Sequence, residues 1–383
     1  MIYLDFAATT KPSREAIDIF AEVNEKFWAN PDSMHDLGIK AEAVLAHSRK
    51  TILDCFSVSP NEYNLIFTSS ATESNNLAIK SVANLRKNTK KHIISSDIEH
   101  PSVREVLFFL QKEGFNVEFL PVNENGMVSI EQIEKAVTKD TALVSIMHVN
   151  NEIGSVNDVF EIAKTVKRKN KQTLFHSDFS QSVGKLPVGL SGAEIDFISF
   201  SGHKIECVKG VGALIYKKNI AISPQLHGGS QEFGFRASTS NTAAAAALAK
   251  SVKTAIKNQK ENYEKALNLQ KILLENLSQI PAIQINTPIN ENKPFASSPF
   301  ILNFSVTKQK SETILRALSQ KEIYISTVSA CSAKKAKESY VVKAITKDTK
   351  RAESSLRVSL SAETTEAEIL IFVEELKRIL NSL

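Results

Sequence analysis

The chain has 383 residues, of which only 13 are glycine, about half the proportion usual in a soluble protein. Hydrophobic residues make up 42% and charged residues 23%, which excludes an intrinsically disordered chain and a membrane-embedded one. Basic residues number 47 and acidic residues 42, and the formal charge of +5 is too small and too dispersed to indicate nucleic-acid binding. At this length we expect two domains.

The three cysteines, Cys55, Cys207 and Cys331, are an odd number and share no paired spacing. This argues against a disulfide framework and against a C-x-x-C metal site, and it favours a reducing compartment. The N-terminal residues lack the pattern of a signal peptide, and no segment reaches the ~18 apolar residues that a membrane span needs. We therefore expect a cytoplasmic protein with no metal site, no membrane contact and no direct contact with nucleic acid.

Short apolar segments rich in β-forming residues alternate with amphipathic segments through the first part of the chain. The predicted strands are 65–68, 92–95, 117–120, 143–149, 173–176, 197–200 and 211–216. Amphipathic segments with helical periodicity lie between them, as at 102–112 and 159–168. Buried strands separated by helices predict an α/β domain with a mainly parallel central sheet and helices on both faces.

The sequence changes character in its last third. A long, lysine-rich helical segment covers 244–277 and leads into a loop rich in proline and asparagine at 281–299. Beyond this loop we predict strands at 300–305 and 323–326, with a helix at 312–318 between them. Short strands and helices mixed in this way predict an α+β domain.

The last helix of the chain has the clearest sequence pattern. Thr365 and Glu368 form a capping box at its start. Apolar residues follow at helical spacing on one face, at Ile369, Phe372, Val373, Leu376, Ile379 and Leu380. We place this helix in a small domain made of residues 1–15 and 256–383, and we assign residues 16–255 to a large domain that carries the ligand site.

Polar segments follow five of the predicted strands, at the sheet edge where ligands bind in parallel α/β folds. They are 69–76, 99–101, 148–154, 177–182 and 201–204. The hydroxyl-rich turn that begins at Ser69 can bind phosphate through backbone N–H groups and the helix dipole, although simple N-capping is the more common explanation for such residues taken alone. A single histidine such as His100 is more often structural. Together, the five segments predict one ligand-binding crevice.

One cofactor chemistry uses this whole set of side chains. A lysine in a desolvated site can hold an aldehyde as a Schiff base, and pyridoxal 5'-phosphate is the common biological case. Such a site needs a lysine, a phosphate cradle, a carboxylate facing the pyridine nitrogen and a flat group over the ring. Lys204, the turn at 69–72, Asp178 and His100 can fill these roles in that order. The carboxylate keeps the ring nitrogen protonated, so that the ring accepts electrons.

Five segments resemble motifs of the cysteine desulfurases, which are pyridoxal-phosphate enzymes of the class V aminotransferase group. They are YLDFAATT (3–10), SSATESNN (69–76), VSIMHVNNEIG (144–154), SFSGHK (199–204) and SAC (329–331). The resemblance covers nearly the whole chain, and its second and third segments are long and specific. It implies the type I pyridoxal-phosphate enzyme fold and an enzyme that converts L-cysteine to L-alanine.

The resemblance assigns roles to the candidate site residues, motif by motif. Lys204 would form the Schiff base with the cofactor and later move protons between substrate and cofactor. His100 would stack on the ring, and Asp178 would pair with the ring nitrogen. Two amides, Gln181 and Asn151, would hold the phenolic oxygen of the cofactor and the substrate side. The phosphate would be bound by Ala71, Thr72, Ser201 and His203.

Two further residues are assigned by the same resemblance. Thr239 resembles the residue that reaches the phosphate in a neighbouring subunit, which implies a homodimer. Arg357 would bind the substrate carboxylate through two parallel hydrogen bonds, and Asn151 would also contact the substrate. These roles place the cofactor on the large domain and the carboxylate-binding arginine on the small one.

Cys331 would be the nucleophile that takes sulfur from the substrate and holds it as a persulfide. It lies in a hydrophilic segment that we expect to be a mobile loop, and nearby Lys334 and Lys335 would lower its pKa. Its nine-residue spacing to Tyr340 resembles the branch of the family whose members pass sulfur directly to partner proteins. The expected acceptor is a tRNA-thiolating enzyme or an iron–sulfur scaffold.

The chain departs from the family pattern at positions where glycine is usual, namely Ser70, Cys207, Ser238, Val328 and Ser361. A side chain at such a position can clash with a ligand or require a strained φ. Two alternatives therefore stay open: another class V reaction, either selenocysteine cleavage or transamination, and a catalytically weakened paralogue that acts as a scaffold. Cys207 is interpreted as a packing replacement for glycine, with a redox or sulfur-relay role as the alternative.

Overall fold

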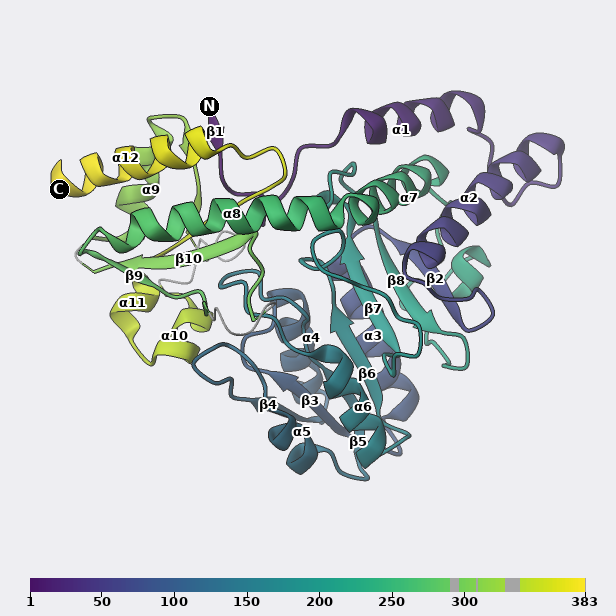
Figure 1. Cartoon of the computed structure of the whole chain (residues 1–383). Helices are drawn as coiled ribbons and strands as arrows, with labels where there is room; N and C mark the ends of the chain where they lie inside the picture. The colour runs from purple at the N-terminus through teal and green to yellow at the C-terminus, as the bar shows by residue number, and fades with distance from the viewer. Residues whose placement is uncertain (290–295, 308, 328–337, 383) are drawn as a thin grey trace.

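The computed structural model describes residues 1–289, 296–307, 309–327 and 338–382, and within these a seven-stranded sheet forms the centre (Figure 1). Its strand order is β2-β8-β7-β6-β5-β3-β4. The strands are β2 (Tyr63–Thr68), β3 (His92–Ser96), β4 (Asn116–Leu120), β5 (Thr141–Ser145), β6 (Leu174–Asp178), β7 (Phe197–Ser201) and β8 (Gly212–Lys217). Only β8 runs antiparallel to its neighbours. The predicted mainly parallel sheet is therefore confirmed.

Helices cover both faces of this sheet because its strands are apolar on both sides. Successive residues of a strand point to opposite faces. Ile93 accordingly packs with α3 (Ala71–Arg86) and α4 (Pro101–Lys112), whereas Ile94 packs into the other layer. That layer contains α2 (Asp36–Cys55), α5 (Ile130–Ala136), α6 (Val159–Lys169) and α7 (Thr242–Lys257), and α1 (Arg14–Lys26) packs on α7.

The C-terminal part of the chain and the first residues form a second group of elements around a separate apolar core. A four-stranded antiparallel sheet has the order β12-β13-β10-β9, and β1 pairs in parallel with β11. The elements of this group are β1 (Ile2–Tyr3), α8 (Gln259–Ser278), β9 (Ile283–Ile285), β10 (Ile301–Val306), α9 (Ser311–Ser319), β11 (Ile323–Tyr324), β12 (Ser326–Thr327), β13 (Ser355–Ser359) and α12 (Glu366–Ser382). Two further helices of this part of the chain, α10 (Tyr340–Thr346) and α11 (Thr349–Glu353), bury apolar side chains in the core of the central sheet instead. The domain division at 16–255 therefore stays a prediction.

Three details differ from the sequence-based expectations. The single helical segment expected at 244–277 is two helices, because Asn258 leaves the helical conformation between α7 and α8. β5 ends earlier than expected, at Ser145, and the chain turns later, where the Oδ1 of Asn150 accepts the backbone N–H groups of Glu152 and Ile153. β9 lies inside the segment expected to be a loop. No helix in the described part of the chain combines the length and apolar character needed to cross a membrane.

The start of α12 has the predicted capping box. The backbone N–H of Thr365 donates to the Glu368 carboxylate at 2.9 Å, and the backbone N–H of Glu368 donates to the Thr365 hydroxyl at 3.3 Å. This cap orients the helix so that Phe372 is fully buried in the small core, while the neighbouring Ile371 is half exposed.

Replacing Phe372 with alanine should lower the free energy of unfolding by about 3–5 kcal/mol, because a large aromatic side chain is removed from a close-packed core. The matched control is Ile371→Ala on the outer face of the same helix, which should change it by less than about 0.5 kcal/mol. Urea unfolding followed by circular dichroism measures both. Equal destabilisation by the two variants would contradict the packing described for α12.

Candidate active site

A cavity of about 230 Å³ opens at the carboxyl edge of the central sheet, where the predicted polar segments meet. It is bounded by the ends of β6 and β7, the starts of α3 and α4, the N-terminal segment and β13. Ten of the residues predicted for the site line this cavity: Ala71, Thr72, His100, Asn151, Asp178, Gln181, Ser201, His203, Lys204 and Arg357. The sequence-based prediction of a single crevice thus agrees with the structure, whereas the individual roles stay predictions.

The lysine of the site follows β7 directly, in a short 3₁₀ turn, η1 (Gly202–Lys204). Its Nζ donates to the backbone carbonyls of Ala7 at 2.5 Å and Ala8 at 2.7 Å. The N-terminal segment is fixed here a second time, because the backbone N–H and the hydroxyl of Thr10 both donate to the carbonyl of His203, at 2.9 and 3.0 Å. The lysine is therefore held at the cavity wall by a chain segment distant in sequence.

The N-terminus of α3 forms an anion-binding corner of the cavity. Ser70 is the N-cap, with its hydroxyl accepting the backbone N–H of Glu73, and the N–H of Ala71 donates to the Ser201 hydroxyl at 2.6 Å. Backbone N–H groups in the first turn of a helix have no partner within the helix, and the helix dipole favours negative charge there. Behind this turn lies Gly212, where a Cβ would come within 2.7 Å of the Ser70 backbone.

Asp178 lies at the end of β6 and is almost fully buried. Its Oδ1 accepts the backbone N–H of Ser180, and its Oδ2 accepts the side-chain amide of Asn75, both at 2.8 Å. His100 is the N-cap of α4, and its Nδ1 accepts the backbone N–H of Ser102 at 3.1 Å. Burial lowers the pKa of His100, with a further decrease from the charge of Lys204 and an opposing effect of Asp178.

The amide of Gln181 is oriented by a buried lysine that sequence analysis missed. Lys185 Nζ donates to Gln181 Oε1 at 2.9 Å, so the amide nitrogen of Gln181 faces the Ala7 carbonyl, also at 2.9 Å. Burial, with smaller contributions from the charges of Lys204 and Arg357, lowers the pKa of Lys185 to about 7. No residue pattern around Lys185 marks it, because its burial becomes visible only in the folded chain.

Arg357 approaches the cavity from β13. Its Nη1 donates to the carbonyl of Asn151 at 2.8 Å, and its Nη2 forms an ion pair with Asp5 at 2.7 Å. Its Nε is buried and has no hydrogen-bond partner among the described residues. Because an unpaired buried donor is costly, this N–H indicates a missing anionic partner such as a carboxylate.

Two buried acidic residues next to the cavity contact the start of α10, Glu152 through its carboxyl group and Glu99 through its backbone carbonyl. Burial raises the pKa of Glu99 to about 8 and that of Glu152 to about 7. The Ser339 hydroxyl donates to Glu152 Oε2 at 2.6 Å, and the Tyr340 hydroxyl donates to the backbone carbonyl of Glu99 at 2.7 Å. Tyr340 thereby becomes a wall of the cavity. Both acids fall in segments that the sequence analysis singled out, but neither was predicted as a site residue.

Backbone strain was expected where this chain has a side chain at a usual glycine position. That expectation is wrong for the four such positions that the structure describes. Ser70 has an extended φ of −175°, which any residue adopts, and Cys207, Ser238 and Ser361 are not among the residues with positive φ. Glu206 is the residue with positive φ (59°) in the turn after Lys204. Burial raises the pKa of the Cys207 thiol to about 11, which opposes thiolate chemistry there and favours the packing interpretation.

Thr239 does not line the cavity. It is exposed and borders a separate hollow with Arg236, which forms an ion pair with Glu73 at 2.8 Å in the first turn of α3. Cys331, Lys334, Lys335 and Val328 lie outside the described residues. Their expected roles therefore stay predictions.

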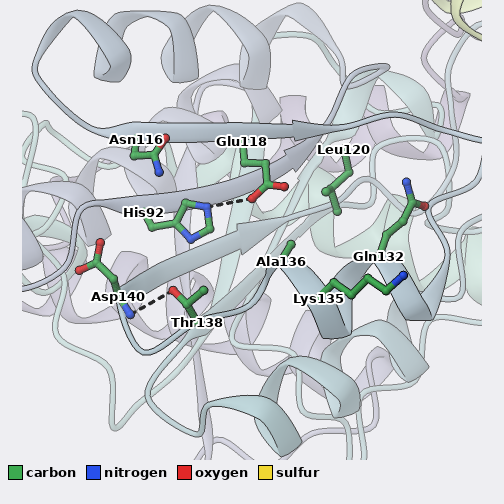
Figure 2. A pocket seen from close by; sticks show the side chains of 9 residues that line it. All are labelled: His92, Asn116, Glu118, Leu120, Gln132, Lys135, Ala136, Thr138 and Asp140. Atoms are coloured by element: carbon green, nitrogen blue, oxygen red, sulfur yellow. Dashed lines mark hydrogen bonds and ion pairs between the residues drawn. The ribbon is translucent and has the colours of Figure 1, made fainter.

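Another surface hollow, of about 470 Å³, lies over β3, β4 and α5 (Figure 2). His92 faces it and is held by Thr141 at 2.9 Å and by Glu118 at 3.2 Å. It contains none of the predicted site residues. Across the described residues, no group of three or more histidine, cysteine or acidic side chains is arranged to bind a metal ion.

The donors in the cavity fit pyridoxal 5'-phosphate. The α3 N-terminus with Ser201 and His203 suits the phosphate, Asp178 suits the pyridine nitrogen, and Lys204 suits the aldehyde carbon. Burial and the neighbouring Lys204 lower the pKa of His203 to about 4, so its ring is neutral at physiological pH and offers one N–H. The bare Nε of Arg357 remains for a substrate carboxylate.

Comparison with known proteins agrees with this arrangement. The class-V aminotransferase family profile matches residues 2–372. The cysteine desulfurase IscS of Clostridium botulinum is 36% identical over 99% of this chain and 94% of its own length, and IscS of Escherichia coli O139:H28 is 35% identical over 100% and 93%.

Solved structures show the same similarity. A NifS-like protein superposes with a TM-score of 0.93 at 34% identity over the full length of both chains, which confirms the type I fold. The structure of SspA in complex with cysteine gives a TM-score of 0.80 at 30% identity, covering 95% of this chain and 100% of that one. The chain belongs to the class-V aminotransferase family and, within it, to the cysteine desulfurases.

Proposed function

We propose that this protein is a pyridoxal-phosphate-dependent cysteine desulfurase that converts L-cysteine to L-alanine and collects the sulfur as a persulfide on Cys331. The observation that carries the proposal is the buried Nε of Arg357, which lacks a partner and lies on the same cavity as Lys204 and Asp178. A substrate with a carboxylate and an amine on one carbon would place its carboxylate at Arg357 and its amine on the Lys204 side of the cavity. The similar protein SspA was solved in complex with cysteine, which supports this substrate class.

The residues of the chain divide the proposed work among them. Bound pyridoxal phosphate supplies an electron sink that weakens the bonds at the substrate α-carbon. Arg357 binds the substrate carboxylate through Nε and Nη2, while its contacts with Asp5 and Asn151 keep the guanidinium plane fixed. Lys204 Nζ takes and returns the α-proton. The Cys331 thiolate attacks the substrate sulfur, the Cβ–S bond breaks, and a proton delivered to Cβ completes alanine.

The two alternatives are weaker. Transamination needs no sulfur acceptor and leaves Cys331 without a role, and selenocysteine cleavage would use the same residues without a distinguishing feature on this chain. The inactive-scaffold alternative rested on side chains at positions where glycine is usual. Ser70 and Cys207 have no positive φ, so backbone strain at these two positions does not support it. The sulfur acceptor is proposed to be a tRNA-thiolating enzyme or an iron–sulfur scaffold, and a cytoplasmic location stays a prediction.

We also propose a homodimer in which Thr239 of one subunit completes the phosphate site of the other. In the single chain Thr239 is exposed and absent from the cavity, although its segment is anchored at the N-terminus of α3 by the Arg236–Glu73 ion pair. The segment is thus fixed next to the anion-binding corner while Thr239 itself lies outside the cavity, as expected of a residue that serves a neighbouring subunit.

Replacing Lys204 with alanine should remove the visible absorbance of the purified protein, because the cofactor can no longer be held covalently. Alanine formation from L-cysteine should fall by at least about a hundredfold, since the proton-transfer group is also lost. Lys209→Ala, on an exposed residue close in sequence, is the matched control and should keep the colour. A colourless wild-type protein, even after incubation with pyridoxal phosphate, would contradict the enzyme assignment.

Replacing Cys331 with serine should reduce sulfide release from L-cysteine in the presence of a thiol reductant by about two orders of magnitude or more, because the nucleophile is removed. Cys55→Ser and Cys207→Ala are the matched controls and should retain activity. Mass spectrometry of the alkylated wild-type protein should locate the persulfide on the peptide that contains Cys331. A persulfide on either other cysteine would show the nucleophile to be misassigned.

Mixing two inactive variants tests the shared site. Thr239→Val should weaken cofactor binding about ten- to a hundredfold, because a hydrogen bond to a charged group is lost. After subunit exchange with Lys204→Ala, each heterodimer contains one site with both native residues, so activity at limiting cofactor should reappear. If Thr239 acted within its own chain, no heterodimer site would be native, and the mixture would stay as inactive as its components.

A further inference from the structure

A continuous line of buried hydrogen bonds connects His100 with Asp178. Asn75 Nδ2 lies 2.8 Å from Asp178 Oδ2 and 2.8 Å from Ser102 Oγ, and Ser102 Oγ lies 2.8 Å from His100 Nδ1. The four residues come from three elements, the end of β6, the first turns of α3 and the start of α4. All except His100 are at most 8% exposed, so water does not compete with these contacts.

The position of each proton in this line follows from the charge at one end. A carboxylate only accepts hydrogen bonds, so Asn75 must present its nitrogen to Asp178. The second N–H of the same nitrogen then points to Ser102 Oγ, which accepts it. The single hydroxyl proton of Ser102 is therefore donated to His100 Nδ1.

His100 Nδ1 receives a second donor, the backbone N–H of Ser102 at 3.1 Å. A ring nitrogen that accepts from two donors carries no proton, and the neutral imidazole then carries its proton on Nε2. Nε2 is the nitrogen turned away from α4, and His100 is one of the residues that line the cavity. The line of hydrogen bonds therefore determines which nitrogen offers a proton to the site.

We propose that Asn75 and Ser102 are positioning residues that keep His100 neutral and protonated on Nε2. They do so through the line of hydrogen bonds that begins at the Asp178 carboxylate and ends at His100 Nδ1. This inference rests on the proposed function and deepens it, because it says which ring nitrogen of His100 donates a hydrogen bond into the cavity. Among the described residues the amide oxygen of Asn75 has no hydrogen-bond partner, so the two N–H bonds orient this amide.

Other charges face His100, and they set the background for this effect. Asp178 on β6 raises the pKa of His100, whereas burial, Lys204 in η1 and Arg357 on β13 lower it. None of these groups distinguishes one ring nitrogen from the other as directly as a donor placed on Nδ1. Removing the hydroxyl donor should therefore change the protonation of His100 while the surrounding charges stay the same.

Replacing Ser102 with alanine should raise the pKa of His100 by about half a unit to one unit, because one of the two donors that oppose protonation of Nδ1 is gone. Ser102→Thr keeps the hydroxyl and should keep the wild-type pKa. Ser81→Ala, at a buried serine of α3 whose hydroxyl accepts the backbone N–H of Ser223 and which does not line the cavity, is the control for a general effect of losing a buried hydroxyl. Histidine-selective ¹⁵N NMR of the cofactor-loaded protein measures both the pKa and the protonated nitrogen.

The role of Asn75 is tested by combining substitutions. In an Asn75→Ala background, Ser102→Ala should shift the His100 pKa by clearly less than it does alone, because the serine hydroxyl is no longer forced toward Nδ1. The acid limb of the kcat/KM profile should move upward together with the NMR pKa in Ser102→Ala.

An unchanged His100 pKa in Ser102→Ala would overturn the proposal, as would a wild-type ring protonated on Nδ1. Both readouts come from the protein itself and do not depend on which substrate it turns over. If the protein failed to release sulfide from L-cysteine while the NMR shifts appeared as expected, the proposed function would fail and the positioning roles of Asn75 and Ser102 would stand.

Discussion

The buried negative charge of Asp178 is the constraint on which the geometry of the site depends. A carboxylate that is only 6% exposed must be surrounded by donors, or the chain would not keep it there. Asn75 and the backbone of Ser180 supply two of these donors at 2.8 Å, and a protonated pyridine nitrogen would supply another. Asn75 belongs to α3, whose N-terminus forms the anion-binding corner. The contact between Asn75 and Asp178 therefore fixes that corner relative to the carboxylate.

The N-terminal segment connects this site to Arg357, the residue proposed to bind the substrate carboxylate. Its first residues pair with β11, Asp5 forms the ion pair with Arg357, and the carbonyl of Ala7 accepts from both Lys204 and Gln181. Within this short segment, Asp5 and Ala7 together contact Arg357, Lys204 and Gln181. The segment thus contacts Arg357 on one side and Lys204 on the other, so it fixes the spacing between the guanidinium group and the amine.

Sequence analysis could locate the site residues that lie in recognisable segments of the chain. Strand-end segments identified the crevice, and motif resemblance placed ten side chains such as His100 and Arg357 around one cavity. Asn75 and Ser102 were inside or beside those segments but were interpreted only as helix starts, because their partners are far away in sequence. Lys185 had no pattern at all, since a buried lysine is recognisable only by what surrounds it. The break at Asn258 was missed because one asparagine in a long lysine-rich helical pattern is a weak signal.

The low glycine content has a physical explanation in the distribution of backbone conformations. Gly212 is retained where a Cβ would meet the Ser70 backbone at 2.7 Å, so the antiparallel strand β8 can pass directly behind the phosphate corner. Ser70 itself has an extended backbone, and its side chain caps α3, a function that glycine would perform less well. A side chain therefore stands at Ser70, where the extended conformation tolerates it, and glycine stands at Gly212, where β8 passes close behind the same turn. A glycine-poor chain can thus form an anion-binding turn when a single glycine lies behind it.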